Sequence, residues 1–457
     1  MDRRPTVAGL HRASFIFRRH DVYRIDPAAV YAHESVMGNP VYRARVERVV
    51  AALKEPRQVV TYADSDLPDM VRNRGLLAGR SRAMGTMEHV PDAILLFNTF
   101  RFDSAESARA RREALAEATG QNLWHGLPGT GAFAWFPANL ESDPHKQEKV
   151  CRPCWRIHLQ EGCLHKCKYC SLGGLVVAMV NVEDYCRHLG ELIRRHPWQT
   201  TYLLDDDGDP PCLEPELGTL GALIEFFGTL EDRYLIIHTK TWNTEWMRDL
   251  KHNGHTIIVW SVSGPTQSRL IEPGTGTTEQ RIEAARIAQE AGYQIRYKFK
   301  PIIPVKSWRE DAAYTVRLIF EKTNPDVISL CTFMWTSYSD MVKWLPMDLL
   351  DADFVKAAEA SQGEMGDALV RPFPHAMRQQ IYEHHLAEIR KHNQSVPVSL
   401  STEDFRMWAA MKDLLGCAAT NYVCGCGPQC SPGLRTLAVH PFKVAVRNDG
   451  GAVPGVV

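Results

Sequence analysis

The sequence predicts an α/β fold whose central part is a parallel, barrel-like sheet. Between about residues 151 and 340, short apolar strand segments alternate with helical segments, which is the pattern of consecutive β/α units. Residues 1–150 mix strand and helix signals irregularly, and residues 341–457 lose the alternation. We therefore expect an N-terminal α/β region over 1–150, the barrel over 151–340, and a helical C-terminal extension with a cysteine-rich metal site over 341–457.

Each expected element follows from its residues. Runs rich in Val, Ile, Tyr and Thr predict strands, and segments rich in Ala, Leu, Glu and Arg predict helices. Because β/α connections return the chain to the same edge, the barrel strands are parallel, and an active site lies at their carboxyl ends. The expected strands are 59–62, 93–100, 156–159, 201–204, 234–239, 256–261, 294–303 and 327–331; the expected helices are 42–53, 104–119, 182–194, 216–227, 278–291, 308–321, 374–391 and 403–415.

Composition and charge narrow the class of protein. The hydrophobic fraction of 44% and the charged fraction of 23% are ordinary for a soluble globular protein. The net charge of −1 gives no overall attraction to DNA, which leaves a local basic groove as the electrostatic route to it. No apolar run reaches about 18 residues, and the N-terminus lacks the apolar core of a secretion signal. We expect a cytoplasmic protein with no membrane partner.

Most of the 12 cysteines fall in three sets. Such clustering suits metal ligation in a reducing cytosol better than disulfide formation. The sets are Cys151 and Cys154; Cys163, Cys167 and Cys170; and Cys417, Cys424, Cys426 and Cys430.

The middle set, Cys163, Cys167 and Cys170, has the spacing C-x3-C-x2-C. Three such thiolates hold three irons of a [4Fe–4S] cluster and leave the fourth iron open. An open iron can bind S-adenosylmethionine (SAM) and reduce it, which releases a 5′-deoxyadenosyl radical that abstracts hydrogen. This spacing is the signature of the radical SAM superfamily. The alternative, a zinc knuckle, normally needs a fourth ligand and paired C-x2-C halves.

The C-terminal set is interrupted by Gly425 and Gly427, which let the backbone turn tightly around a metal. We expect the four thiols of this set to bind a second Fe–S cluster or a zinc ion; free thiols are the alternative. Cys151 and Cys154 precede the first barrel strand and offer additional ligands.

The stretch from about residue 23 to 330 resembles spore photoproduct lyase, a family of radical SAM enzymes that reverse a thymine photoproduct in DNA. The resemblance implies a partial (β/α)6 barrel, one SAM-bound [4Fe–4S] cluster, and an electron donor such as flavodoxin or ferredoxin. The matching segments are 25–29 (Ile-Asp-Pro-Ala-Ala), 162–170, 180–184 (Val-Asn-Val-Glu-Asp), 239–240 (Thr-Lys), 251–254 (Lys-His-Asn-Gly), 272–275 (Glu-Pro-Gly-Thr), 281–285 (Arg-Ile-Glu-Ala-Ala) and 291–293 (Ala-Gly-Tyr).

The resemblance also implies roles for single residues. It assigns Lys240 to the SAM carboxylate and Ser261 to a hydrogen bond with SAM, where the alternatives are a surface lysine and an ordinary strand-end serine. Tyr169 is expected to shield the cluster or to pack on SAM. Cys212 is expected to donate a hydrogen atom to the product radical, because a thiol S–H bond is weak; the alternative is a buried structural cysteine.

An acidic run follows the second barrel strand. Radical SAM enzymes often place acidic or polar residues at this strand end to hold the SAM amino group. Asp205, Asp206 or Asp207 is therefore expected to do so, and a solvated loop is the alternative.

Two departures from the family leave the substrate open. Ser171 stands where the family has a tyrosine, and Thr332, Phe333 and Met334 stand where it has His and Arg at the lesion. The first hypothesis is reversal of a thymine photoproduct in DNA. The second is radical modification of a peptide or small metabolite, assisted by an auxiliary Fe–S cluster.

Overall fold

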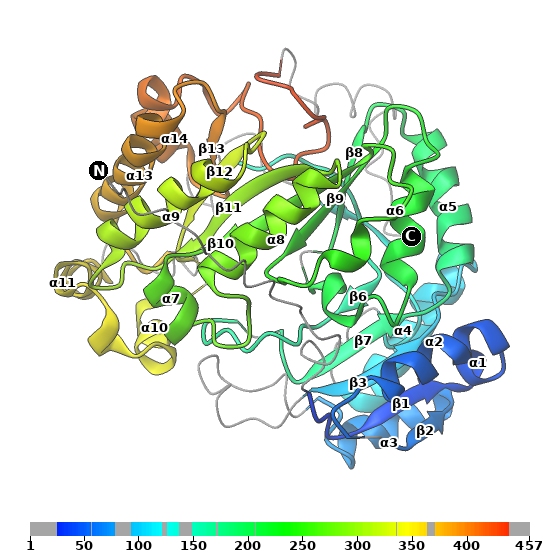
Figure 1. The fold of residues 1–457 in the computed structure, drawn as a ribbon. Helices are drawn as coiled ribbons and strands as arrows, with labels where there is room; N and C mark the ends of the chain where they lie inside the picture. Colours follow the sequence, from blue (N-terminus) through cyan, green and yellow to red (C-terminus); the bar gives the residue numbers. More distant parts are fainter. Residues whose placement is uncertain are drawn as a thin grey trace, which may run out of the picture.

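Two sheets and the helices packed around them make up the chain (Figure 1). The computed structural model describes residues 25–55, 57–77, 93–120, 126–136, 149–170, 172–205, 207–334, 336–362 and 371–437. The larger sheet contains the expected barrel strands, and the smaller one contains the N-terminal strands.

The larger sheet has the strand order β13-β12-β11-β10-β9-β8-β5-β4. Its strands run parallel, except for β4, which is antiparallel to β5. Among the described residues no pair joins β13 to β4, so the sheet is a partial barrel, which confirms the expected fold class. The strands are β4 (Phe133–Phe136), β5 (Cys154–Ile157), β8 (Thr201–Leu204), β9 (Tyr234–Thr239), β10 (Thr256–Val262), β11 (Gln294–Ile302), β12 (Ile328–Thr332) and β13 (Val398–Leu400).

Helices cover the outer face of this sheet (Figure 1). In α5 the buried residues Val182, Tyr185, Leu189 and Ile193 recur every three or four positions, as they must to form one apolar stripe. None of the described helices is both long and apolar enough to span a membrane. The helices from α5 onward are α5 (Val182–Arg195), α6 (Thr219–Phe227), α7 (Pro265–Leu270), α8 (Thr278–Glu290), α9 (Trp308–Lys322), α10 (Tyr338–Trp344), α11 (Ala352–Ala360), α13 (His375–His392) and α14 (Phe405–Leu415); α10 and α11 lie to one side of the sheet in Figure 1.

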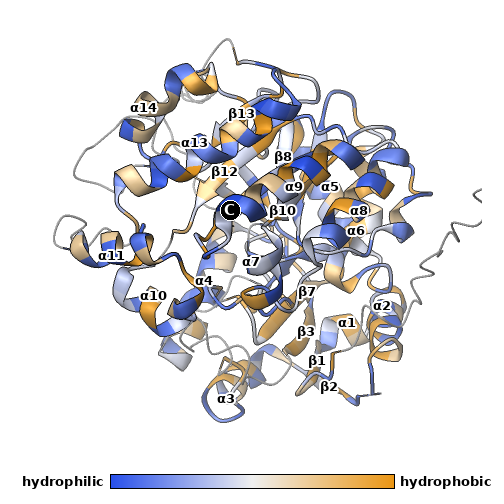
Figure 2. Cartoon of the chain, turned by 60° about the vertical axis from the view of Figure 1, so that its left-hand side comes forward, coloured by the Kyte–Doolittle hydropathy of each residue, from blue (hydrophilic) through white to orange (hydrophobic). Residues whose placement is uncertain are grey.

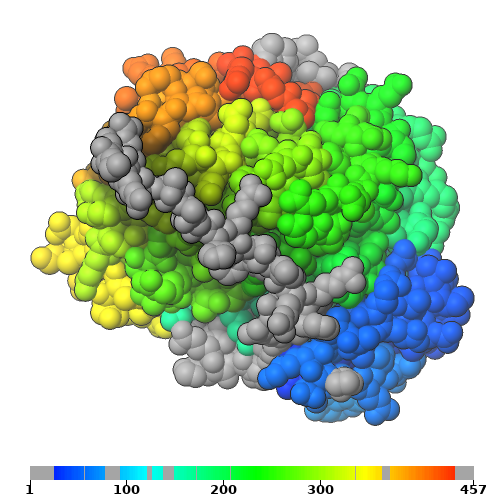
Figure 3. Space-filling model, viewed as in Figure 1, coloured from blue at the N-terminus to red at the C-terminus, as the bar shows by residue number. Residues whose placement is uncertain are grey.

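The smaller sheet has the order β2-β1-β3-β7-β6 and lies at one side of the molecule, with the blue N-terminal helices against it (Figures 1 and 3). Its strands β1, β3 and β7 are largely apolar (Figure 2) because both of their faces are buried. The elements are β1 (Val30–His33), β2 (Val59–Tyr62), β3 (Ile94–Asn98), β6 (Gln160–Glu161), β7 (Leu175–Met179), α1 (Glu34–Met37), α2 (Pro40–Ala51), α3 (Leu67–Arg72) and α4 (Ala105–Thr119).

Strand pairing crosses both expected region boundaries. β7 lies within the expected barrel region but pairs with β3 of the N-terminal sheet, and β13 of the C-terminal extension pairs in parallel with β12. The division at residues 150 and 340 therefore stays a proposal. The expected strands and helices are present with ends shifted by a few residues, whereas β1, β4, β7 and β13 were not expected.

Candidate active site

The three closely spaced cysteines lie in a loop beyond the carboxyl end of β5. Cys167 is buried, and Cys163 and Cys170 are partly exposed. The Cys163 N–H donates to the Leu172 carbonyl over 2.9 Å, and the Cys170 N–H to the Cys167 carbonyl over 3.0 Å. The three thiols lie close enough to interact electrostatically. The structure thus brings the three thiols of this loop together at the edge where the barrel rule places an active site.

His165 fixes this loop to its surroundings. Its Nε2 lies 3.0 Å from the Asp209 carboxylate, and its Nδ1 lies 2.7 Å from the Gly274 carbonyl oxygen. A Cβ at Gly274 would lie 2.7 Å from the backbone nitrogen of Lys166, so this close approach requires glycine. Asp209 also accepts a hydrogen bond from the Lys240 N–H over 2.8 Å, which ties the cysteine loop to the end of β9.

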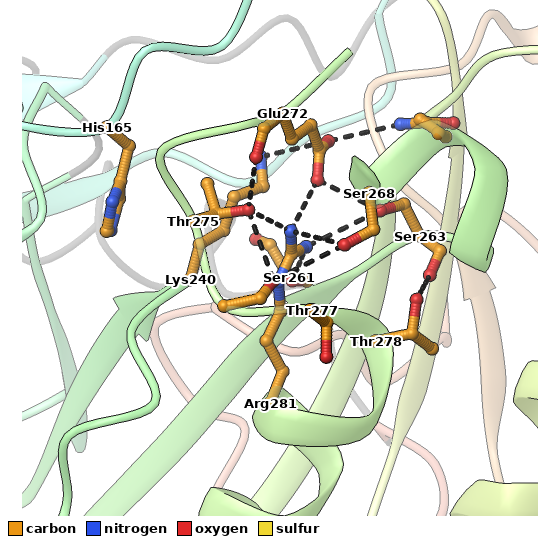
Figure 4. A network of polar contacts seen from close by, with 12 residues as sticks. His165, Lys240, Ser261, Ser263, Ser268, Glu272, Thr275, Thr277, Thr278 and Arg281 are labelled. Atoms are coloured by element: carbon orange, nitrogen blue, oxygen red, sulfur yellow. Dashed lines mark hydrogen bonds and ion pairs between the residues drawn. The ribbon is translucent and has the colours of Figure 1, made fainter. Parts of the chain in front are cut away.

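A buried polar network lies beside the loop (Figure 4). The Lys240 ammonium donates to the Tyr169 hydroxyl over 2.5 Å, and that hydroxyl donates to Glu272 over 2.6 Å. Arg281 contacts the other carboxylate oxygen of Glu272 at 2.7 Å, and the Ser263 hydroxyl donates to that oxygen over 2.9 Å. The carboxylate therefore holds two cations at the carboxyl ends of β9 and β10.

Charge in this network is set by its partners. Burial alone would raise the pKa of Glu272, but Lys240 and Arg281 outweigh burial and lower the pKa to about 2. Burial likewise acts to lower the pKa of Lys240, and Glu272 and Cys167 outweigh it, so the pKa is raised. Lys240 is therefore a cation that lies next to the Cys167 thiol of the cysteine loop.

Ser261 and the acidic run occupy different places. Ser261 is half-buried on β10, and its carbonyl accepts a hydrogen bond from Arg281 over 3.0 Å. Asp205 is fully buried, and its carboxylate contacts His158 at 3.0 Å and the N–H groups of Leu159 and Gln160. Asp205 thus holds residues 158–160, which lead into the cysteine loop, through hydrogen bonds. Asp206 lies outside the described residues, and the Asp207 carbonyl accepts from the Gly162 N–H over 2.8 Å.

Cys212 lies in the short 3-10 helix Pro210–Leu213 that follows β8. It is 5% exposed, and the side-chain amide of Gln160 lies 3.8 Å from its sulfur. Burial raises the pKa of this thiol well above its ordinary value, so it stays protonated. Its S–H group lies within electrostatic range of Cys163.

The end of β12 carries Thr332, Phe333 and Met334. Thr332, Phe333 and Met334 are buried, and the Phe333 ring lies 6.1 Å from the Tyr169 ring. Thr332 contacts the Tyr382 hydroxyl at 3.1 Å instead of facing the cysteine loop. Ser171 lies outside the described residues.

The C-terminal cysteines lie elsewhere, at the amino ends of the barrel strands. The sulfurs of Cys424 and Cys430 are 3.8 Å apart, and Cys426 packs against a small apolar cluster on β8, β9 and β10 that includes Ile236 and Val259. The Cys417 sulfur is 3.8 Å from the Val398 carbonyl oxygen, at the end of α14.

Sequence reasoning missed three residues of the site. Glu272 and Arg281 belong to segments that matched the family, but no role was expected for them, and Asp209 was passed over beside the acidic run. Sequence spacing could not connect them to Lys240, because they belong to separate segments that meet only after folding.

Three comparisons with known proteins agree on one family. The model of the spore photoproduct lyase family matches residues 149–337. Spore photoproduct lyase of Clostridium acetobutylicum is 29% identical over 172 residues, which cover 36% of this chain and 51% of that protein. The Bacillus subtilis enzyme is 29% identical over 175 residues, which cover 37% of this chain and 50% of that protein. The chain thus spans about half the length of these two curated relatives.

The fold agrees over a longer stretch. A double mutant of spore photoproduct lyase, with AdoMet and a dinucleoside spore photoproduct bound, superposes with a TM-score of 0.57 at 16% identity. This match covers 82% of this chain and 98% of that chain. The resemblance noted in the sequence is therefore matched by the family model over residues 149–337, and the fold of the chain is similar to that of a solved spore photoproduct lyase.

Proposed function

We propose that this chain is a radical SAM enzyme that reverses a thymine photoproduct in DNA. The observation that carries the proposal is the placement of Cys163, Cys167 and Cys170 at the carboxyl edge of a parallel partial barrel, next to Lys240. Its relatives are spore photoproduct lyases, and a solved structure of similar fold holds AdoMet and a dinucleoside spore photoproduct.

The thiols fit a [4Fe–4S] cluster with one open iron. Three thiols from one loop leave the fourth corner without a protein ligand, and the nearby Lys240 cation offsets the negative charge of a thiolate-bound cluster. Bound there, the cluster supplies the electron that cleaves SAM to a 5′-deoxyadenosyl radical. A flavodoxin or ferredoxin of the cytoplasm stays the predicted electron donor.

Lys240 and Ser261 are proposed to position SAM. A lysine ammonium binds a carboxylate through a charge-assisted hydrogen bond. Glu272 keeps Lys240 protonated and, through Tyr169, limits where its ammonium group can point. The Ser261 side chain lies on the neighbouring strand and offers a hydroxyl donor.

Cys212 is proposed to return a hydrogen atom to the product radical. Because burial keeps the thiol protonated, it carries the S–H bond that such a transfer breaks. The hydrogen atom passes to the product carbon and leaves a sulfur-centred radical on Cys212.

The test uses anaerobically reconstituted protein with SAM, dithionite and a dinucleotide that carries the spore photoproduct. Mass spectrometry then measures free thymidylyl-thymidine and 5′-deoxyadenosine. The proposal predicts both products, and a Cys163→Ala variant forms neither. Deoxyadenosine without the repaired dinucleotide would reject the DNA lesion and direct attention to a peptide or small-metabolite substrate.

A further inference from the structure

A cysteine-rich segment closes the end of the barrel opposite to Lys240. The N–H groups of Thr200 and Thr201, at the amino end of β8, donate to the Pro428 carbonyl over 2.9 and 3.1 Å. The Gly425 N–H donates to the Ser329 hydroxyl, at the amino end of β12, over 3.2 Å. The segment therefore reaches across the amino ends of the sheet from β8 to β12, which are separated by β9, β10 and β11. In Figure 1 it is the orange-red chain between β13 and β8.

Three thiols of this segment converge. The sulfurs of Cys424 and Cys430 are 3.8 Å apart, and the Cys424 N–H donates to the Cys430 sulfur over 3.4 Å. A Cβ at Gly427 would lie 2.7 Å from the Cys430 sulfur and 2.9 Å from the Cys424 sulfur. The loop therefore curls so tightly around its thiols that this position excludes any side chain. Cys426 lies within range of the Lys298 ammonium, 3.7 Å from its sulfur.

A fourth thiol, that of Cys151, belongs to a segment far from this loop in the sequence, at the start of the barrel region. Cys151 directly precedes β5 and lies within electrostatic range of Cys426. Its neighbour Arg152 donates to the Tyr422 carbonyl over 2.7 Å and would lie 3.8 Å from a Cβ at Gly427. The segment around Cys151 is thereby packed against the cysteine loop.

The surroundings of the thiols are cationic and buried. Arg152 is 2% exposed, and within the described part of the chain its Nε and Nη1 atoms have no hydrogen-bond partner. Lys298 is 4% exposed, and the hydrogen bond it is shown to donate goes to a thiol. Unsatisfied buried donors of this kind are costly unless an anionic group faces them. Thiolates that share a metal supply that negative charge.

We propose that Cys151, Cys424, Cys426 and Cys430 hold a second metal centre, an iron–sulfur cluster or a zinc ion, at the amino end of the barrel. A spacing of 3.8 Å suits two thiolates on one metal, since bonds of about 2.3 Å in a tetrahedral arrangement separate two sulfurs by about 3.8 Å. No three His, Cys, Asp or Glu side chains of the described residues already stand in single-ion geometry, so uptake of the metal requires thiol side chains to rotate.

This ligand set differs from the run of four that the sequence suggested. Cys417 is replaced by Cys151, because the Cys417 sulfur contacts the Val398 carbonyl and the charged groups that act on it are Arg390 and Arg152, with no cysteine among them. Cys417 therefore serves as a matched control within the same segment. Cys424 and Cys426 are partly exposed, and orange-red atoms of the C-terminal segment reach the surface in Figure 3, so a metal has access from solvent.

The proposed centre faces the barrel interior. Ile236, which belongs to the apolar cluster against which Cys426 packs, lies four positions before Lys240 on the same face of β9, a separation of about 13 Å along an extended strand. His238 lies between them, and its imidazole interacts with the Cys426 thiol. The second centre would thus lie at the opposite end of β9 from the cysteine loop.

The test measures metal in the full chain after Cys163, Cys167 and Cys170 are all changed to Ala, which removes the proposed catalytic cluster. Iron, acid-labile sulfide and zinc are quantified after anaerobic purification and after reconstitution, together with the visible absorption spectrum. We expect retained metal: iron with sulfide identifies a cluster, and about one zinc without sulfide identifies a zinc site. Metal at background level would overturn the proposal.

Single variants in that background assign the ligands. Cys424→Ser and Cys151→Ser should each lower metal content at least fivefold, whereas Cys417→Ser should leave it unchanged. Cys426→His keeps a metal-binding group, so it should retain metal and shows that loss elsewhere is not misfolding. For an iron–sulfur cluster its visible spectrum should also shift. Loss on Cys417→Ser with retention on Cys151→Ser would reject this ligand set. Because no SAM cleavage is measured, failure here is distinct from failure of the proposed function.

Discussion

The Lys240 ammonium lies 3.7 Å from the carboxylate of Glu272, and the Glu272 side chain is completely buried. Lys240 directly follows β9 and Glu272 follows α7, and the two residues meet beside the thiol of Cys167. A buried carboxylate between Lys240 and Arg281 is held ionised, and it in turn holds Lys240 in place. Glu272 therefore anchors Lys240, the proposed SAM-binding cation, in the interior of the barrel.

Changing Glu272→Gln should weaken SAM binding and destabilise the fold. The substitution leaves Lys240 and Arg281 without their shared counter-charge, and breaking a buried pair of this kind costs about 3–5 kcal/mol. We expect a lower midpoint of thermal unfolding and at least about tenfold weaker SAM binding, measured by equilibrium dialysis. The exposed Glu279→Gln variant on α8 is the control. Unchanged SAM affinity would show that Glu272 does not position the SAM site.

Lys240→Ala should reduce SAM affinity but leave the cluster intact. Loss of a charge-assisted hydrogen bond of about 2–3 kcal/mol corresponds to about 30- to 150-fold weaker binding. Iron and sulfide content should stay at the level of the unmodified protein, because Lys240 is not a thiol ligand. The exposed Lys251→Ala variant controls for general loss of charge. An equal loss of iron and of SAM binding would point to a structural role instead.

Cys212→Ala should separate SAM cleavage from product formation. The thiol is buried and protonated, so its removal takes away a hydrogen-atom donor without changing the charge of the site. Formation of 5′-deoxyadenosine should change less than about threefold, while repaired dinucleotide falls at least about tenfold. Cys186→Ala, on α5, is the matched control. Normal repair by Cys212→Ala would remove Cys212 from the mechanism.

Glu214 should make stability depend on pH. Burial raises the pKa of Glu214 from 4.5 to about 7, against hydrogen bonds from Leu220 and Gly218 that lower it. The folded-state pKa lies above the unfolded value, so the folded protein binds the proton of Glu214 more tightly than the unfolded chain does. The free energy of unfolding that this proton contributes is fully present below about pH 4.5 and is lost as the pH rises through 7.

Comparison of unfolding free energies at pH 5 and pH 8 checks this. Relative to Glu214→Gln, the unmodified protein should lose about 3 kcal/mol over that interval. The exposed Glu225→Gln variant should follow the unmodified protein. Parallel pH profiles for Glu214→Gln and the unmodified protein would contradict the assignment.

Local chemistry explains what sequence reasoning predicted well. Buried parallel strands such as β9 and β10 are continuous apolar runs, and helices such as α5 repeat their apolar residues every three or four positions, so both are visible without a partner. The cysteine loop was equally visible, because ligand spacing for a cluster is a property of one short segment.

Which strands pair with each other in the sheets could not be predicted in the same way. β7 follows the cysteine loop but joins the N-terminal sheet, and the three residues of β13 extend the barrel from beyond its expected end. Strands this short carry too little pattern to identify themselves, and pairing depends on which edge is free after the rest has folded.

The sequence by itself determined the α/β architecture, the order of the barrel strands along the chain, and the set of three cysteines, since these depend on residues close together in the chain. Only the tertiary structure decided that Glu272 and Arg281 support Lys240, that Asp209 and His165 anchor the loop, and that Cys151 approaches Cys426. These relations join residues on separate segments of the chain, and their distances are set by strand register and packing, which no local pattern encodes.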